Sequence, residues 1–194
     1  PLTSIINYVD LLKREKIESE PARSYIQILE AKSLRLKQLT DDLVEASKIS
    51  SGNIEYQREP LNVVELLNQS VGEFSEKFEA QNLKVILEAE KKEEAVIYAD
   101  SRRMWRIIEN LFHNICKYAM PSTRVYLETD VEDEAVVLTM KNISQVQLQI
   151  RTEDLTERFI RGDVSRTTEG SGLGLFIAKS LTQAQGGSLQ VALD

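Results

Sequence analysis

The sequence is poor in the residues that would direct it to an oxidising compartment or into a membrane. Its 194 residues include one cysteine, Cys116, so no disulfide can form within the chain, which is consistent with a reducing compartment. No apolar run approaches the roughly 20 residues that a membrane-spanning helix needs. We therefore expect the chain to be a cytoplasmic domain.

Basic residues are fewer than acidic residues. The formal net charge is −7, with 31 acidic residues against 24 Lys and Arg, which argues against a nucleic-acid-binding protein because such a protein carries a basic patch. A hydrophobic fraction of 42% and a charged fraction of 28% indicate a globular chain with a core. The sequence starts at Pro1 without an initiator methionine and ends inside an expected strand, so we expect a piece of a longer protein.

Glycine is scarce except in one short stretch. Only eight glycines occur, and residues 169–175 place three of them at alternate positions, Gly170, Gly172 and Gly174. Glycine allows positive φ and lets a ligand approach the backbone closely. The helix expected directly after this loop would point unpaired N–H groups and the positive end of its dipole at that ligand. The loop therefore suits a phosphate group.

The first 52 residues have the apolar spacing of two helices. One is expected over residues 2–12 and a longer one over residues 21–49, with a polar break between them that makes an antiparallel hairpin. The second helix is too long for the first to cover, so we expect two hairpins to form a four-helix bundle in a homodimer. A hairpin packed on its own C-terminal domain is the alternative.

The pattern changes to α+β after Ser51-Gly52-Asn53, which divides the chain into expected domains 1–52 and 53–194. Asp100 or Ser101 can cap one of the helices that follow. The helices are expected over residues 63–80, 101–118, 153–160 and 176–185. Alternating apolar residues predict strands over residues 54–58, 83–88, 95–99, 125–129, 135–141 and 188–193.

The helix expected over residues 101–118 carries the second candidate for chemistry. Asn110, Asn114 and Lys117 are four and three residues apart, so they share one face. Asn oxygens can ligate Mg²⁺, which binds through substrate phosphates, and Lys adds a point charge to the same phosphates. A solvated polar stripe is the alternative for any one of them, but together with Tyr118 and the glycine loop they favour a phosphate site. The opposite face would meet the sheet through Ile107, Ile108, Leu111, Phe112 and Ile115.

Three stretches resemble, in order and spacing, the sequence boxes of sensor histidine kinases of two-component systems. Residues 110–118 (NLFHNICKY) resemble the N box, residues 155–161 (LTERFIR) the F box, and residues 170–175 (GSGLGL) the second glycine box. Residues 1–12 resemble the segment just downstream of the phosphoacceptor histidine. The resemblance covers essentially the whole chain.

This resemblance implies a fold and an activity. The hairpin would dimerise into a four-helix bundle, and a two-layer α/β sandwich would bind ATP with Mg²⁺. The intact parent would be an ATP-dependent protein-histidine kinase, which passes phosphate from its histidine to an aspartate of a response-regulator receiver domain. Such parents often have an upstream, membrane-spanning sensor region.

The resemblance also implies roles for single residues. Asn114, helped by Asn110, would hold Mg²⁺; Lys117 would contact phosphate, and Tyr118 would pack against the nucleoside. Residues 145–169 would form a lid. The side chains of Arg161 and Arg158 would contact the phosphate during transfer. Backbone groups of the glycine loop would bind the phosphates as well, at Gly170, Ser171, Gly172, Leu173, Gly174 and Leu175.

Two departures from the family stand out. The Asp-x-Gly-x-Gly box, whose Asp binds the adenine amino group, is replaced, and we expect Asn142 to make this contact through its carbonyl while Ser144 stands in place of a glycine. The phosphoacceptor histidine would lie upstream of Pro1. His113, which is the single histidine, lies inside the N box and is assigned no role.

Two other functions remain as alternatives. Related ATPases that hydrolyse ATP use a Glu four residues before the Mg²⁺-binding Asn, but this position is Asn110, and Glu109 faces about 100° away on the helix. Hydrolysis is therefore disfavoured. The altered adenine box keeps open a degenerate domain that acts as a nucleotide-sensing dimeric scaffold.

Overall fold

The computed structural model describes residues 4–5, 7–8, 11–12, 20–51, 55–89, 94–132, 135–145, 155 and 172–193. The chain divides into two compact units, Pro1–Ser47 and Lys48–Asp194. Within the described ranges, no helix is both long enough and apolar enough to cross a membrane.

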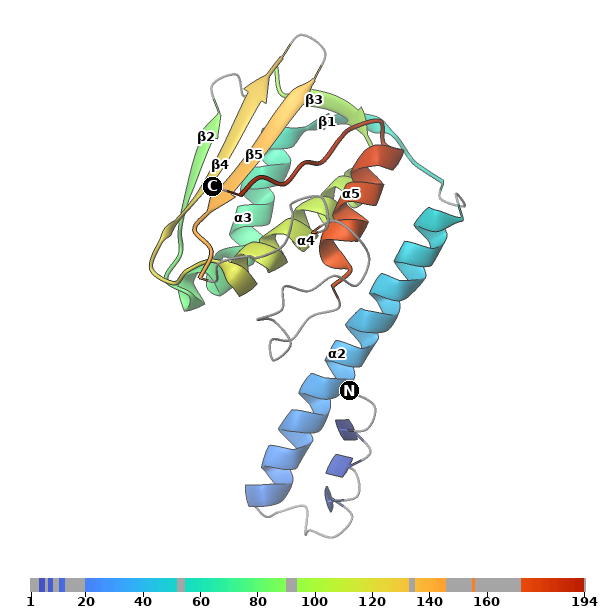
Figure 1. Ribbon diagram of the computed structural model, residues 1–194, viewed down its shortest axis with the longest axis vertical. Coiled ribbons are helices and arrows are strands. Elements are labelled where there is room, and N and C mark those ends of the chain that lie inside the picture. The colour runs from blue at the N-terminus through green and yellow to red at the C-terminus, as the bar shows by residue number, and fades with distance from the viewer. Residues whose placement is uncertain are drawn as a thin grey trace. The chain divides into compact units, whose positions relative to one another are not determined.

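The first unit is helical, as expected. Helix α2 (Glu20–Ser50) is 31 residues long, within one residue of the expected bounds at both ends. The described residues between 4 and 12 are also helical, and they run along α2 in Figure 1. The rings of Tyr8 and Tyr25 lie 5.9 Å apart between centroids, so the two segments pack together as a hairpin.

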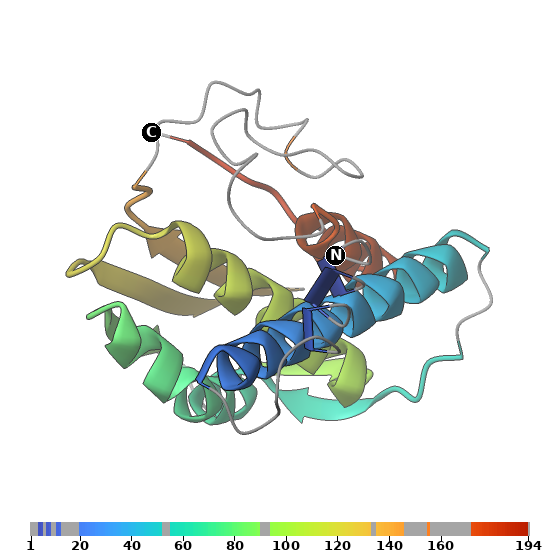
Figure 2. The same ribbon diagram turned by 90° about the horizontal axis from the view of Figure 1, so that it is seen from below.

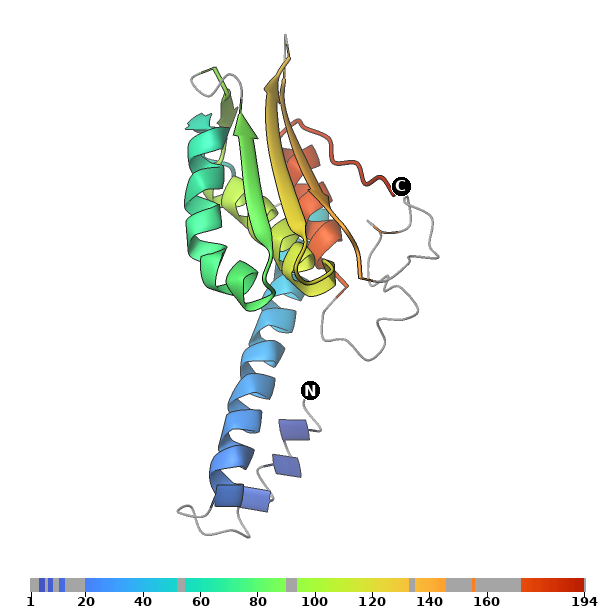
Figure 3. The same ribbon diagram turned by 90° about the vertical axis from the view of Figure 1, so that its left-hand side faces the viewer.

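The second unit combines five strands and three helices among its described residues, which confirms the α+β class. Strands β2, β4 and β5 form one sheet in the order β2-β4-β5, with β2 parallel and β5 antiparallel to β4, while β1 and β3 form a separate antiparallel pair. Figure 3 shows the three-stranded sheet with α3 alongside it. The elements are β1 (Glu59–Asn62), α3 (Val63–Ala80), β2 (Lys84–Ala89), β3 (Val96–Ala99), α4 (Ser101–Tyr118), β4 (Arg124–Val131), β5 (Val136–Asn142) and α5 (Gly174–Ala184).

Side-chain caps explain where two of these helices begin. The Asn62 side chain accepts hydrogen bonds from the N–H groups of Val64 and Glu65 at the start of α3. The Asp100 carboxylate accepts one from the Arg103 N–H at the start of α4, so Asp100 is the expected cap. Both satisfy N–H groups that a helix start leaves unpaired.

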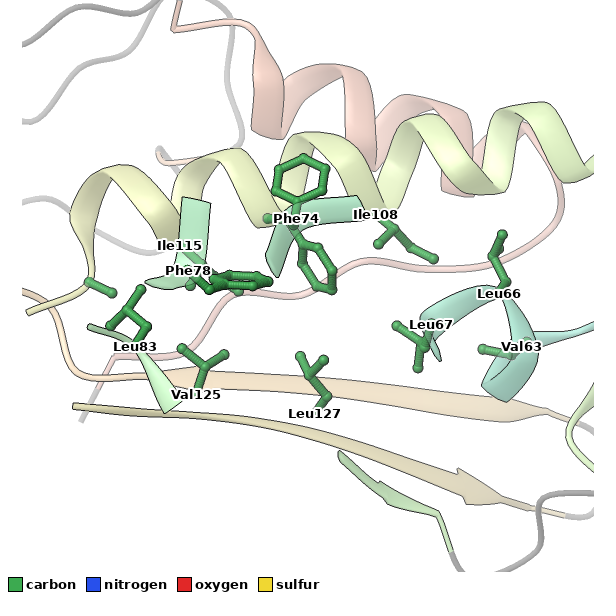
Figure 4. Packing of buried hydrophobic residues seen from close by; sticks show 12 residues of the cluster. Val63, Leu66, Leu67, Phe74, Phe78, Leu83, Ile108, Ile115, Val125 and Leu127 are labelled. Carbon is green, nitrogen blue, oxygen red and sulfur yellow. The ribbon is translucent and has the colours of Figure 1, made fainter. Parts of the chain in front are cut away.

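The core lies between the helices α3 and α4 and one face of the sheet. Figure 4 shows Val125 and Leu127 of β4 facing the helices, and both are fully buried because alternate residues of a strand share a face. The rings of Phe74 and Phe78 on α3 meet Phe112 of α4 edge-on at 5.4 and 5.3 Å. Helix α5 packs on α4, as Figures 1 and 2 show, and buries Ile177, Ala178 and Leu181.

Two strand predictions are wrong. The first strand lies at Glu59–Asn62 rather than at residues 54–58, because its partner β3 pairs with this later segment and the edge position tolerates Pro60. Residues 188–193 pair with no described strand, so their alternating pattern does not produce one. The helix expected over residues 153–160 lies outside the described residues, apart from Leu155.

Candidate functional site

The predicted polar face of α4 is present, but its residues differ in their surroundings. Asn110 is 8% exposed, whereas Asn114 and Lys117 are half-buried. The Asn110 amide nitrogen donates to the Arg106 carbonyl oxygen at 2.8 Å, which fixes its side chain. Of the residues expected on the opposite face, Leu111 is half-buried and the others are buried.

The glycine stretch meets the N-box helix at Gly174. A Cβ placed on Gly174 would lie 3.1 Å from Asn110 Oδ1, a distance shorter than ordinary van der Waals contact. The absence of a side chain at this position therefore allows α5 to approach α4 closely. Two sequence stretches about sixty residues apart thus meet at one place.

The loop before α5 also requires glycine. Gly172 has a φ of 71°, in the left-handed region that residues with a Cβ rarely adopt. Leu173 follows at the N-cap, and its apolar side chain cannot accept a hydrogen bond from the first N–H groups of the helix. An anion is a suitable acceptor at such a helix start.

Asn114 carries a polar atom that fits a missing ligand. Its amide nitrogen is buried and has no hydrogen-bond partner in the part of the chain that the structure describes. A buried amide without a partner is unfavourable by about 1–3 kcal/mol, and the amide can rotate to present its oxygen. Residues Asn114 and Asn110 therefore suit a hard cation that brings its own waters and phosphate oxygens.

The charged end of Lys117 is held by its neighbour. Its Nζ donates to the Tyr118 hydroxyl at 2.7 Å and lies 4.5 Å from the centroid of the Tyr118 ring. This geometry combines a hydrogen bond with a cation–π contact. The ammonium would have to leave the hydroxyl to reach a phosphate.

The segment after β5 is tied to the end of α4. Gln145 donates twice, from its backbone N–H to the Tyr118 carbonyl and from its side-chain amide to the Lys117 carbonyl, each at 2.9 Å. Ser144 bridges to Ala119, which brings Ser144 beside the N box, while Asn142 is exposed at the end of β5. Gln145 is the first residue of the predicted lid, but the sequence assigns it no contact of its own.

Two further side chains near the site have other partners. Glu109 pairs with Arg106 at 2.7 Å, so this carboxylate is engaged in an ion pair. The exposed His113 sets its ring edge-on to Phe74, at 5.0 Å between centroids. The remaining predicted site residues, Arg158, Arg161, Gly170 and Ser171, lie outside the described residues.

Comparisons with protein families agree with this arrangement. Residues 99–193 match the family described as "Histidine kinase-, DNA gyrase B-, and HSP90-like ATPase", and residues 1–52 match the "His Kinase A (phospho-acceptor) domain". Sensor protein VanSC of Enterococcus gallinarum is 33% identical over 192 residues, which are 97% of this chain and 52% of that protein. The chain therefore spans about half the length of this curated relative.

Solved structures share the fold. Full-length ShkA in complex with AMPPNP has a TM-score of 0.79 at 24% identity, covering 100% of this chain and 40% of that one. The histidine kinase ThkA in complex with the response regulator protein TrrA has a TM-score of 0.70 at 20% identity, covering 96% of this chain and 52% of that one. At these identities the likeness concerns the fold alone.

Proposed function

Because the chain belongs to the sensor histidine kinases of two-component systems, we propose that it is the catalytic core that binds Mg-ATP and transfers the γ-phosphate to a histidine. That histidine would lie outside this chain, since His113 packs against Phe74 within the ATPase unit. A response-regulator aspartate would then receive the phosphate.

The observation that carries this proposal is the close approach of Asn110 and Gly174. It sets the Asn110 side chain of α4 next to the start of α5, where backbone N–H groups favour an anion. A triphosphate with a divalent cation requires both kinds of group, because its charge must be neutralised from more than one side. The unpartnered amide of Asn114 supports the same ligand.

The roles of the residues follow from their chemistry. Asn114 and Asn110 would hold Mg²⁺, which supplies charge neutralisation when bound. Lys117 would exchange the Tyr118 hydroxyl for a phosphate oxygen, and the Tyr118 ring would pack on the nucleoside. Asn142 and Ser144 would line the adenine side, where Asn142 can accept from the adenine amino group. Arg161, with Arg158, would steady the γ-phosphate during transfer.

Transfer breaks the bond between the γ-phosphorus and its bridging oxygen and forms a phosphorus–nitrogen bond to the imidazole, which loses a proton while ADP departs. The protein has little covalent chemistry to perform in such a step, so positioning and charge neutralisation dominate. The Arg106 ion pair engages Glu109, which disfavours Glu109 as the base that a hydrolase would need.

We also propose that the protein acts as a homodimer, with a response-regulator receiver domain as its partner. Leu34 and Leu43 on α2 are 62% and 55% exposed, and apolar side chains of this size favour burial in a bundle. The parent protein would be a sensor with its kinase core in the cytoplasm. The complex between ThkA and TrrA supports the choice of partner.

The experiment is a calorimetric titration of this chain with ATP, ADP and GTP, each with and without Mg²⁺. We expect Mg²⁺-dependent binding of the adenine nucleotides, weakened at least about tenfold by Asn114→Ala, which corresponds to about 1.4 kcal/mol. Asn68→Ala is the matched control, because Asn68 is an exposed asparagine on α3 that bonds the Val64 carbonyl. Absence of nucleotide binding in the unmodified chain would refute the kinase proposal.

A further inference from the structure

Helices α4 and α5 approach each other closely at one end of their contact and are linked by a hydrogen bond at the other. At one end Gly174 meets Asn110. At the other, the Asp100 N–H donates to the side-chain oxygen of Gln185 at 2.7 Å. The start of α5 lies beside Asn110 and its end beside Asp100, so the two helices run antiparallel. The lengths between these two contacts agree, since ten residues of α4 and eleven of α5 are roughly 15 and 16 Å long.

A third segment of the chain joins the end that lies away from the predicted nucleotide residues. Residues 55–58, here called the entry segment, lead into β1. The Gln57 N–H donates to Asp100 Oδ2 at 2.9 Å, and the Arg58 guanidinium donates to the Ala184 carbonyl at 3.2 Å in the last turn of α5. A cation at a helix C-terminus is also favoured by the helix dipole. We refer to Gln57, Arg58, Asp100 and Gln185 as the clasp.

Asp100 is the centre of the clasp. It is 6% exposed, and each of its carboxylate oxygens accepts a different hydrogen bond. Oδ1 accepts from the Arg103 N–H and so caps α4, while Oδ2 accepts from the Gln57 N–H of the entry segment. Burial by itself would raise the pKa of Asp100, but hydrogen bonds from the N–H groups of Gln57, Arg103 and Arg102, together with the positive charge of Arg103, leave the pKa below its usual value. The buried carboxylate is therefore satisfied as an anion.

The helices that meet at the clasp are the same helices that carry the proposed nucleotide site. The N-box residues follow along α4, and Gly172 and Gly174 lie at the opposite end of α5. Helix α5 is a single rod whose apolar side, formed by Ile177, Ala178 and Leu181, is buried. A rod anchored at one end keeps its other end in place, so the clasp restricts where the glycine loop can lie relative to Asn110.

We propose that Asp100 and Gln185 are positioning residues for the nucleotide site, and that the entry segment and bound nucleotide stabilise the same arrangement of α5 on α4. This inference rests on the proposed function. Its thermodynamic consequence is reciprocal: if the closed clasp favours nucleotide, nucleotide must favour the closed clasp by the same factor.

The test compares hydrogen exchange of the Gln57 amide with nucleotide affinity. Asp100→Asn is the first variant, because asparagine caps helices as well as aspartate but has one acceptor oxygen for the two N–H groups. Gln185→Ala is the second, since it removes the acceptor of the Asp100 N–H. We expect faster Gln57 exchange in the first, by roughly tenfold, because a bond to a charged acceptor is lost.

Both variants should bind Mg-ATP about fivefold more weakly, and saturating Mg-ATP should slow Gln57 exchange in the unmodified chain by the same factor. The control is Phe78→Leu, a core substitution that lowers stability without touching the clasp and should leave the ATP affinity unchanged. If the clasp only stabilised the fold, the variants would bind Mg-ATP as tightly as the unmodified chain, and Mg-ATP would not slow Gln57 exchange.

The inference is overturned if Asp100→Asn speeds Gln57 exchange while the ATP affinity and the effect of ATP on exchange stay unchanged. It is also overturned if Phe78→Leu weakens ATP as much as the clasp variants do, because the effect would then report general stability. An unmodified chain that binds no nucleotide would refute the proposed function and this inference together, which distinguishes it from the first two results.

Discussion

Replacing Gly174 by alanine is expected to force apart the two helices that form the candidate site. The new Cβ would lie 3.1 Å from Asn110 Oδ1, and the Asn110 amide cannot move aside without straining its 2.8 Å bond to the Arg106 carbonyl. Overpacking of this kind is unfavourable by about 1–3 kcal/mol, against a gain of about 0.5–1 kcal/mol when alanine replaces glycine in a helix. We expect a net loss of about 1 kcal/mol in the free energy of unfolding.

Gly72 provides the matched control. It lies in α3, and a Cβ there would meet no atom within 4 Å in the part of the chain that is described. Gly72→Ala should therefore raise the free energy of unfolding by about 0.5–1 kcal/mol. Urea unfolding measures both variants, and the ATP titration should show weaker binding for Gly174→Ala alone.

A double-mutant cycle with Asn110→Ala tests the stated cause. Without the Asn110 oxygen, the alanine at position 174 has no close neighbour, so Gly174→Ala should become neutral or stabilising in that background. The coupling free energy should then be about 1–3 kcal/mol. Equal destabilisation of Gly174→Ala with and without Asn110 would refute the reasoning.

Two further predictions concern Asp100 and Tyr118. The pKa of Asp100 is lower in the folded chain than in the unfolded one, so its contribution to stability is complete above about pH 4 and is lost as the pH falls through the folded pKa. In urea unfolding from about pH 6 to about pH 3, Asp100→Asn should lose less stability than the unmodified chain, and equal losses would contradict this assignment. Tyr118→Phe removes the hydroxyl that holds Lys117 Nζ and keeps the ring, so ATP should bind about threefold tighter in a titration. Weaker binding by Tyr118→Phe would mean that the hydroxyl itself contacts the nucleotide.

Helices α3, α4 and α5 could be predicted because their signals are local. Helix α4 begins after the expected cap and buries four of the five expected apolar side chains, with Leu111 half-buried. Strand β1 could not be placed, because its position depends on β3 and on the backbone N–H of Gln57, which bonds the Asp100 side chain. Residues 188–193 have strand periodicity, but a strand also needs a hydrogen-bonding partner, and no described segment provides one.

The candidate site was predictable to the extent that it follows helix spacing. The three-and-four pattern puts Asn110, Asn114 and Lys117 on one helix, but it does not distinguish the buried, fixed Asn110 from the half-buried Asn114 with its unpartnered amide. The spacing also does not show that α5, which is distant in sequence, approaches Asn110 at Gly174. The hydrogen bond between Asp100 and Gln57 could not be predicted either, because the two residues are distant in sequence, whereas a helix cap is a local signal.

The packing around Asn110 also bears on the choice between phosphate transfer and hydrolysis. A hydrolase of this kind would need glutamate at this position, which is longer by one carbon and charged. The Asn110 oxygen already lies at the limit of approach to Gly174, so a longer side chain would collide with α5. A carboxylate there would also lose the amide N–H that bonds the Arg106 carbonyl, and it would be buried as a charge without that partner. The contact between α4 and α5 therefore disfavours a water-activating base at the same position where it brings the proposed phosphate ligands together.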